Sequence, residues 1–264
     1  MALLELDNVR IRFGGVQAVD GCTFHVKEGE IVGLIGPNGA GKTTVFDLIT
    51  GYLTPDSGQI RYRGRRIDGS PPHIIARQGV GRTFQIIRNF PTMSARDNLV
   101  MAFKDHPGET LLGGFFGGWR GVEQQHLQRA RELMDLVGIR HREDVPAGNL
   151  SYGQQKLLEI ARVIALGTDL FLLDEPMAGV NPAMRRKLLD LIGTLRKQGK
   201  TFLIVEHDLN FIMGVSDRIV VLDYGHVIAD GTPAEVRDNA RVVEAYLGVK
   251  RRDPNDPNLG GANA

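Results

Sequence analysis

The chain has 264 residues, of which 42% are hydrophobic and 24% are charged, and its formal net charge at pH 7 is +1. These proportions are ordinary for a soluble globular protein with a sizeable core, and so small a net charge argues against a nucleic-acid partner. The single cysteine, Cys22, excludes an internal disulfide and fits a reducing compartment. We expect no signal peptide, and no apolar run approaches the ~20 residues that cross a bilayer. Any association with a membrane is therefore expected to be peripheral, through other subunits.

The amino-terminal residues predict two strands. Residues 3–13 alternate between apolar and polar positions, with Val9, Ile11 and Phe13 on one face, and a second strand is expected around Phe24. From periodicity alone, Phe13 is more simply a core residue than a flat surface for a stacked base. Both interpretations stay open at this point.

Residues 31–49 predict a strand, a glycine loop and a helix in succession. The loop matches Gly-x-x-x-x-Gly-Lys-Thr directly after an apolar run, which disfavours a simple glycine-rich turn. Its main-chain N–H groups and the helix amino terminus can hold an anion, Lys42 can pair with the β- and γ-phosphates, and Thr43 can ligate Mg²⁺. We therefore predict a polyphosphate site in this phosphate loop, residues 36–44: Gly36, Pro37, Asn38, Gly39, Ala40, Gly41, Lys42, Thr43 and Thr44.

Shorter elements follow the phosphate loop. Ile60 and Tyr62, separated by an arginine, predict an edge strand. Pro71 and Pro72 predict the start of a short helix that reaches Gly79. Residues 80–84 then predict a strand that ends at Gln85, a residue that carries no functional weight by itself.

From residue 90 to about 167, helical patterns replace the strand patterns. Helices are expected over residues 95–103 and around residues 127–137, and Ser151 is a natural N-cap for a third. Residues 107–121 are glycine-rich with interleaved leucines and aromatic residues, which suits a loop that is mobile or packs on a partner. We therefore predict an inserted helical subdomain.

Two apolar strands in the second half of the chain end in polar residues. Asp174 and Glu175 follow one strand, and His207 follows the next. Open α/β sheets bind their ligands at the carboxyl ends of the strands. Asp174 therefore suits Mg²⁺ coordination, and Glu175 suits orienting or deprotonating water. His207 could donate a hydrogen bond to a γ-phosphate, although a lone histidine is more often structural.

The motifs occur in the order of a known family: GPNGAGKTT, Gln85, LSYGQQ, LFLLDEP and His207. In this order they resemble an ATPase subunit of an ABC transporter over nearly all of residues 3–247. The resemblance implies an α/β P-loop NTPase cassette with a parallel core sheet and an amino-terminal antiparallel β subdomain. It assigns residues 1–89 and 168–249 to the ATPase core, residues 90–167 to the helical subdomain and residues 250–264 to a flexible tail.

The resemblance also implies roles in binding ATP and Mg²⁺. It places Phe13 where the family stacks adenine, which reverses the interpretation as core. Gln85 matches the glutamine that touches Mg²⁺ or the attacking water, and Asp174 the aspartate that serves Mg²⁺. Glu175 resembles the catalytic carboxylate, and His207 the switch histidine. The signature loop, residues 150–155, completes the site of a second subunit through three residues: Ser151, Gly153 and Gln154.

Two residues depart from the family pattern. Tyr152 stands where LSGGQ has its first glycine, which restricts close approach of another backbone. Asn181 stands where many members have aspartate, which weakens the assignment of a dimer contact there.

Several strings resemble the ATP-binding subunits of branched-chain amino acid importers, including GRTFQIIRNF, DEPMAGVNP and LSYGQQKLLEIAR. The expected function is therefore ATP hydrolysis that powers uptake of apolar amino acids from the cytoplasmic face of the membrane. The expected partners are a second ATP-binding subunit, identical or not, the permease subunits and, indirectly, a solute-binding protein. The alternatives are an ATPase of lipopolysaccharide export or urea import, a soluble ABC ATPase, and a regulatory module without turnover. The sequence does not name the solute.

Overall fold

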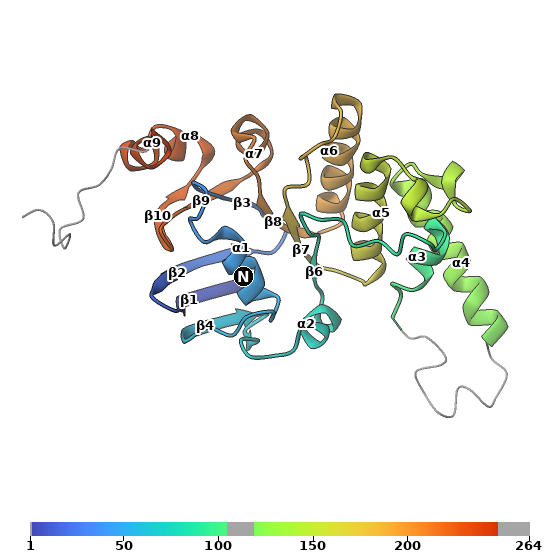
Figure 1. The fold of residues 1–264 in the computed structure, drawn as a ribbon, viewed down its shortest axis with the longest axis horizontal. Coiled ribbons are helices and arrows are strands. Elements are labelled where there is room, and N and C mark those ends of the chain that lie inside the picture. Colours follow the sequence, from blue (N-terminus) through green and yellow to red (C-terminus); the bar gives the residue numbers. More distant parts are fainter. Residues whose placement is uncertain (1, 105–118, 248–264) are drawn as a thin grey trace, which may run out of the picture.

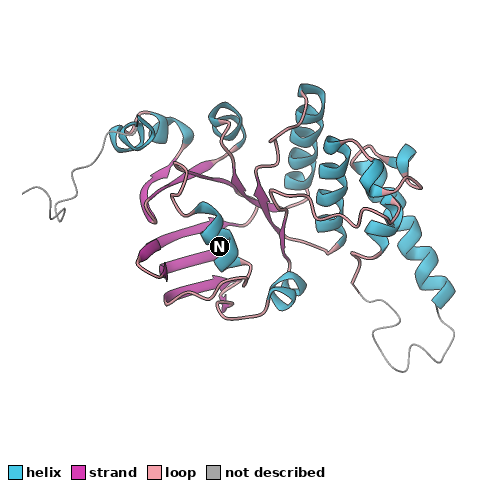
Figure 2. Ribbon diagram, in the orientation of Figure 1, coloured by secondary structure: helices cyan, strands magenta, loops and turns pink. Residues whose placement is uncertain are grey.

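The protein, in a computed structural model, is described over residues 2–104 and 119–247. Residues 107–118 of the glycine-rich segment and the tail at 250–264 lie outside the described residues. Two sheets and a set of helices make up the fold (Figures 1 and 2). None of the described helices is both long and apolar enough to cross a membrane.

The smaller sheet is antiparallel and has the strand order β2-β1-β4-β5. Apolar side chains of β1 are buried at Leu4, Leu6, Val9 and Ile11, as the alternating pattern predicts. The strand predicted at Ile60 and Tyr62 is not at the edge, because the two-residue β5 pairs outside it. The strands span β1 Ala2–Phe13, β2 Val16–Lys27, β4 Ser57–Tyr62 and β5 Arg65–Arg66.

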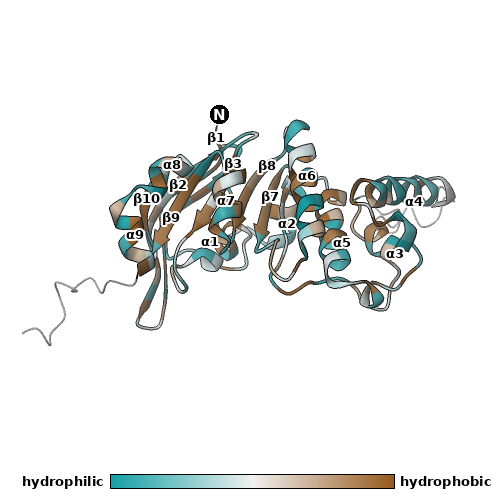
Figure 3. Ribbon diagram, turned by 90° about the horizontal axis from the view of Figure 1, so that it is seen from above, coloured by the Kyte–Doolittle hydropathy of each residue, from teal (hydrophilic) through white to brown (hydrophobic). Residues whose placement is uncertain are grey.

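The larger sheet has the order β10-β9-β3-β8-β7-β6, in which β10 alone runs antiparallel to its neighbour. Every residue of β3, β7 and β8 is buried, as expected for central parallel strands covered on both faces (Figure 3). These three strands are adjacent and parallel, so the loops that follow them lie together at the carboxyl ends of the strands. The strands span β3 Ile31–Ile35, β6 Val80–Arg82, β7 Leu170–Asp174, β8 Thr201–Val205, β9 Arg218–Asp223 and β10 His226–Gly231.

One strand end differs from the sequence prediction. β6 ends at Arg82, although the apolar pattern predicts a strand to Phe84. The Thr83 N–H still donates to the carbonyl oxygen of Leu172 at 3.0 Å, but the Asp174 N–H donates to the Thr83 hydroxyl and not to a main-chain carbonyl, and the Phe84 N–H donates to the side chain of Glu159 at 3.1 Å. The chain therefore leaves the sheet before Gln85.

α5 begins at Ser151, the N-cap that the sequence predicts, and two other helices begin at side-chain caps. Ser151 and Thr232 each form a capping box, and Asn181 caps the helix that starts at Pro182. The helix expected over residues 95–103 ends at Val100. The helices span α1 Lys42–Ile49, α2 Pro72–Gln78, α3 Ala95–Val100, α4 Trp119–Leu136, α5 Tyr152–Ala165, α6 Pro182–Lys197, α7 Leu209–Val215, α8 Pro233–Arg237 and α9 Ala240–Leu247, with 3₁₀ turns η2 Arg140–Arg142 and η3 Ala147–Asn149.

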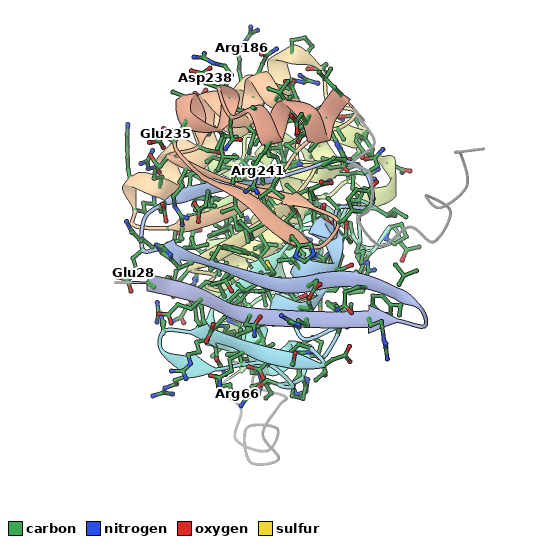
Figure 4. The ribbon with its side chains drawn as sticks, turned by 90° about the vertical axis from the view of Figure 1, so that its left-hand side faces the viewer. Glu28, Arg66, Arg186, Glu235, Asp238 and Arg241 are labelled. Atoms are coloured by element: carbon green, nitrogen blue, oxygen red, sulfur yellow. The ribbon has the colours of Figure 1, made fainter. Side chains whose placement is uncertain are left out.

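Two hydrophobic clusters cover the two faces of the larger sheet. One cluster joins it to α1 and the antiparallel sheet, and the other joins it to α3 through α9. The helices at residues 95–165 thus share a core with the sheet, and the division at residues 90 and 168 stays a prediction. Charged side chains of both signs project outward from the ribbon, among them Arg186 and Arg66 at opposite ends of the view (Figure 4).

Candidate functional site

The phosphate loop requires glycine at two positions for steric reasons. Gly36 has a φ of 152°, and a Cβ there would lie 2.1 Å from the carbonyl oxygen of Leu222. Gly41 has a φ of 100°, and a Cβ there would lie 2.5 Å from the carbonyl oxygen of Ala18. Gly41 is also the N-cap of α1 and offers no side chain to the first turn. The first N–H groups of α1 are therefore available to an anion.

Lys42 supplies a buried cation to this loop. Its side chain is 6% exposed, and its ammonium donates to the carbonyl oxygens of Gly36 at 2.7 Å and Pro37 at 2.8 Å. Burial lowers the pKa of Lys42, while the charges of Glu175 and Asp174 act in the opposite direction. The lysine is thus held at the loop and lies within electrostatic reach of the two carboxylates that follow β7.

Asp174 is held by an arginine that the motif analysis does not single out. Its carboxylate lies 3.1 Å from Arg82 Nη2, and a second nitrogen of Arg82 bonds Asp47 of α1 at 2.5 Å. The Asp174 main-chain N–H donates to the hydroxyl of Thr83. Burial raises the pKa of Asp174, and the Arg82 guanidinium opposes that shift. The strand end, the arginine and α1 together fix the carboxylate.

Glu175 and His207 contact each other directly across the ends of β7 and β8. Glu175 Oε1 lies 2.8 Å from His207 Nε2, and the histidine is half exposed. Glu175 has a φ of 47° and is therefore in the left-handed region, which non-glycine residues seldom adopt. The buried neighbour Glu206 accepts hydrogen bonds from the N–H groups of Met177, at 2.6 Å, and His207, at 3.2 Å. These bonds tie together the two loops that carry the pair.

Gln85 is exposed in the segment after β6, which is attached to α5. Glu159 accepts from the Phe84 N–H, and Asn89 donates to the carbonyl oxygen of Gln155 at 2.9 Å. Burial raises the pKa of Glu159 to about 7, against the hydrogen bond from Phe84. α5 therefore anchors both ends of the segment that contains Gln85.

Phe13 is not a core residue. Its side chain is 48% exposed, whereas Val9 and Ile11 before it are buried. The strand alternation continues to the last residue of β1, beyond the point where the core can cover it. The interpretation of Phe13 from periodicity is therefore wrong, and its ring is available to a ligand.

The signature loop forms the start of α5. Ser151 Oγ accepts from the Gln154 N–H, and Gln154 Oε1 accepts from the Ser151 N–H, at 3.4 and 3.0 Å. Tyr152 is helical and 45% exposed, and its ring packs on Gly179, where a Cβ would lie 3.0 Å from the ring. The Ser151–Gln154 bonds lie within the loop itself and do not join it to the phosphate loop.

Comparison with known proteins identifies the family. A family model described as ABC transporter matches residues 19–178. The protein is 44% identical over 249 residues to the high-affinity branched-chain amino acid transport ATP-binding protein BraF of Pseudomonas aeruginosa, covering 93% of this chain and 98% of that relative. The chain belongs to the ATP-binding proteins of ABC transporters. As a member of this family it binds nucleotide and is an ATPase.

Further relatives and solved structures agree with this family. The corresponding protein LivG of Escherichia coli is 42% identical over 253 residues, 93% of this ABC transporter protein and 98% of LivG. A second family model, described as branched-chain amino acid ATP-binding cassette transporter, matches residues 226–251. A nucleotide-free cassette of an ABC transporter superposes with a TM-score of 0.82 at 32% identity, covering 93% of this chain and 99% of the other. A cassette in its ADP conformation gives 0.81 at 32%, covering 94% and 99%. The predicted α/β cassette fold is confirmed.

Three buried charged residues of this ABC ATPase carry no signal in the sequence: Arg82, Lys156 and Glu159. Each contacts a residue far along the chain. Arg82 and Asp174, for example, are 92 residues apart. Motif spacing cannot reveal such pairs.

Proposed function

We propose that this ABC ATPase powers the import of branched-chain or other apolar amino acids through separate membrane subunits, at the cytoplasmic face of the membrane. Support comes from the names of BraF and LivG and from the second family match near the carboxyl terminus. The same names favour this function over lipopolysaccharide export, urea import and a soluble ABC ATPase. The proposed partners are a second ATP-binding subunit, permease subunits and, indirectly, a solute-binding protein.

ATP is proposed to bind with its phosphates in the phosphate loop and its adenine against Phe13. The loop fits a polyphosphate because it combines uncapped N–H groups with a buried ammonium. Thr43, Gln85 and Asp174 are proposed to hold Mg²⁺, and hydroxyl, amide and carboxylate oxygens are the ligands that this ion prefers. When bound, Mg²⁺ neutralises charge on the phosphates.

Hydrolysis is proposed to depend on Glu175, with His207 beside it. The observation that carries this proposal is the 2.8 Å contact between Glu175 Oε1 and His207 Nε2 at the sheet edge that the phosphate loop also occupies. Glu175 orients the attacking water and accepts its proton. His207 holds that carboxylate through Nε2–H and, being half exposed, can turn to a γ-phosphate oxygen. Gln85 is proposed to contact the water or Mg²⁺.

The second site of a dimer is proposed to need the signature loop. Ser151, Gly153 and Gln154 would face the γ-phosphate held by another cassette, identical or not. An exposed hydroxyl, a glycine N–H and a helix amino terminus suit that anion. Each ATP would then lie between two subunits.

The transport function is tested with the tagged protein purified from membranes of its own cells. We expect permease subunits and a solute-binding protein to co-purify with the tagged protein. In proteoliposomes, the complex is expected to take up labelled leucine, isoleucine or valine only with ATP. Labelled urea serves as the control solute. Uptake of urea without uptake of these amino acids would contradict the assignment.

Gly153→Asp is expected to leave ATP affinity of the single chain unchanged and to lower turnover roughly 100-fold or more. A carboxylate there would meet the γ-phosphate held by the partner and block approach of its backbone. Calorimetry gives the affinity, and phosphate release gives the turnover. Within the chain, the new Cβ would touch the flexible side chain of Met184 at 3.0 Å.

The matched control is Gly193→Asp on α6, where an added Cβ meets nothing within 4 Å. It introduces the same charge at a partly exposed position of α6 and should turn over ATP like the unchanged protein. Normal turnover by Gly153→Asp as well would show that the signature loop does not act on a partner's nucleotide.

A further inference from the structure

Lys156 is a buried cation on α5, five residues after Ser151. Lys156 is 3% exposed, and its ammonium donates to the main-chain carbonyl oxygen of Glu175 at 2.5 Å. The ammonium also lies 5.6 Å from the centre of the Tyr152 ring. Burial of an ammonium is unfavourable unless the group is paired and hydrogen-bonded. A lysine in this place therefore needs a reason beyond packing.

The charges around Lys156 come from three elements. Burial lowers the pKa of Lys156, and four carboxylates oppose that shift: Glu159 on α5, Glu206 after β8, and Asp174 and Glu175 at the end of β7. These charges account for a cation at this position. The carboxylates do not explain where the ammonium points, because its hydrogen bond goes to the main-chain carbonyl oxygen of Glu175.

That carbonyl belongs to a residue with an unusual backbone. Glu175 has a φ of 47° and keeps this left-handed conformation without the freedom of glycine. Its N–H donates to the carbonyl oxygen of Val205 at 2.9 Å, and its own carbonyl accepts from the Lys156 ammonium at 2.5 Å and from the Ala178 N–H at 3.2 Å. Hydrogen bonds therefore hold the Glu175 main chain on both sides of its Cα. The Glu175 side chain places Oε1 2.8 Å from His207 Nε2.

We propose that Lys156 is a positioning residue for ATP hydrolysis, which holds the backbone of Glu175 so that its carboxylate faces the reacting water. The proposal rests on the role proposed above for Glu175. Lys156 touches no substrate atom in it and acts through the Glu175 carbonyl alone.

The same bond links two parts of the site within one chain. Ser151 caps α5, and Lys156 leaves that helix about 7.5 Å further along its axis. The signature loop and the Glu175 carbonyl are therefore joined through the first turns of α5.

The test is a double-mutant cycle between Lys156→Met and Glu175→Gln. Methionine keeps the buried aliphatic chain and removes the donor. Alone, Lys156→Met should lower kcat roughly 10- to 100-fold, because a small misplacement of a reacting group has an effect of that size. KM and the Kd for ATP should change less than about threefold. In the Glu175→Gln background, the same substitution should lower the residual rate less than about twofold.

Lys200→Met is the matched control. Lys200 is a partly buried lysine that pairs with Asp169 at 2.8 Å, at the opposite end of the sheet. Lys200→Met removes a lysine–carboxylate pair far from Glu175 and should keep kcat. If Lys156→Met does not fold, Lys156→Gln takes its place in the cycle with the same expectation for the coupling.

Equal losses of kcat in both backgrounds, or a matching loss of ATP affinity, would overturn the proposal and leave Lys156 a structural residue. A normal kcat for Lys156→Met beside a slow Glu175→Gln would overturn the proposal alone. A normal kcat for Glu175→Gln would remove both this proposal and the role of Glu175 on which it rests.

Discussion

Glu175→Gln is expected to lower the rate of ATP hydrolysis about 10²–10⁴-fold while ATP binding survives. Glutamine has nearly the shape of glutamate and can still accept a hydrogen bond from His207 Nε2, which lies 2.8 Å from Glu175 Oε1. It cannot accept the proton of the attacking water. Affinity for ATP should be kept, because the substitution removes a negative charge next to an anionic ligand.

The variant should therefore accumulate as an ATP-bound dimer. Size-exclusion chromatography with Mg²⁺-ATP should show that dimer, and the same run with ADP should show the single chain. Glu28→Gln, at an exposed turn after β2, is the control for loss of a carboxylate and should hydrolyse ATP normally. A Glu175→Gln variant that turns over ATP at the unchanged rate would assign the chemistry to another residue.

The phosphate loop is the part of the site that sequence predicts most completely. Its glycines, Lys42 and the start of α1 are neighbours in the chain, and local geometry alone brings their polar groups together. Glu175 and His207 are also foreseeable, because each lies within two residues of the end of an apolar strand and adjacent parallel strands bring their carboxyl ends together.

Contacts between distant residues are the part that sequence could not predict. β6 ends at Arg82, and just beyond it the Phe84 N–H bonds Glu159, which is 75 residues away. The apolar pattern of the strand contains no trace of that partner. For Phe13 the sequence predicts too much burial. Phe13 continues the alternation of Ile11, but the hydrophobic core ends before it.

The backbone of Glu175 illustrates why site geometry goes beyond a motif. The acidic pair after β7 is visible in the letters LFLLDEP, but the left-handed φ is not. The main chain of Glu175 is held by hydrogen bonds with Val205 on the neighbouring strand, with Ala178 and with Lys156 on α5. A sequence motif therefore identifies the reacting residue, and tertiary contacts set its orientation.

Lys42→Ala is expected to weaken ATP binding at least about 100-fold, because charge-assisted hydrogen bonds to phosphate are worth about 1.5–3 kcal/mol each. The ammonium is buried and rests on the carbonyl oxygens of Gly36 and Pro37. In the ATP complex, phosphate oxygens are expected to take the place of those carbonyls as partners of the ammonium. Alanine leaves the uncapped N–H groups of α1 as the main attraction for the anion.

Calorimetric titration with ATP and with AMP separates this loss from damage to the loop. A lysine that serves the β- and γ-phosphates should change the affinity for ATP strongly and the affinity for AMP little. Lys42→Met keeps the buried aliphatic chain and should show the same pattern, while Lys27→Ala, on the exposed end of β2, should bind ATP normally. Near-normal ATP affinity in both Lys42 variants would contradict the assignment of residues 36–44 as the phosphate site, since the anion would then be held without the only buried ammonium that the described loop provides.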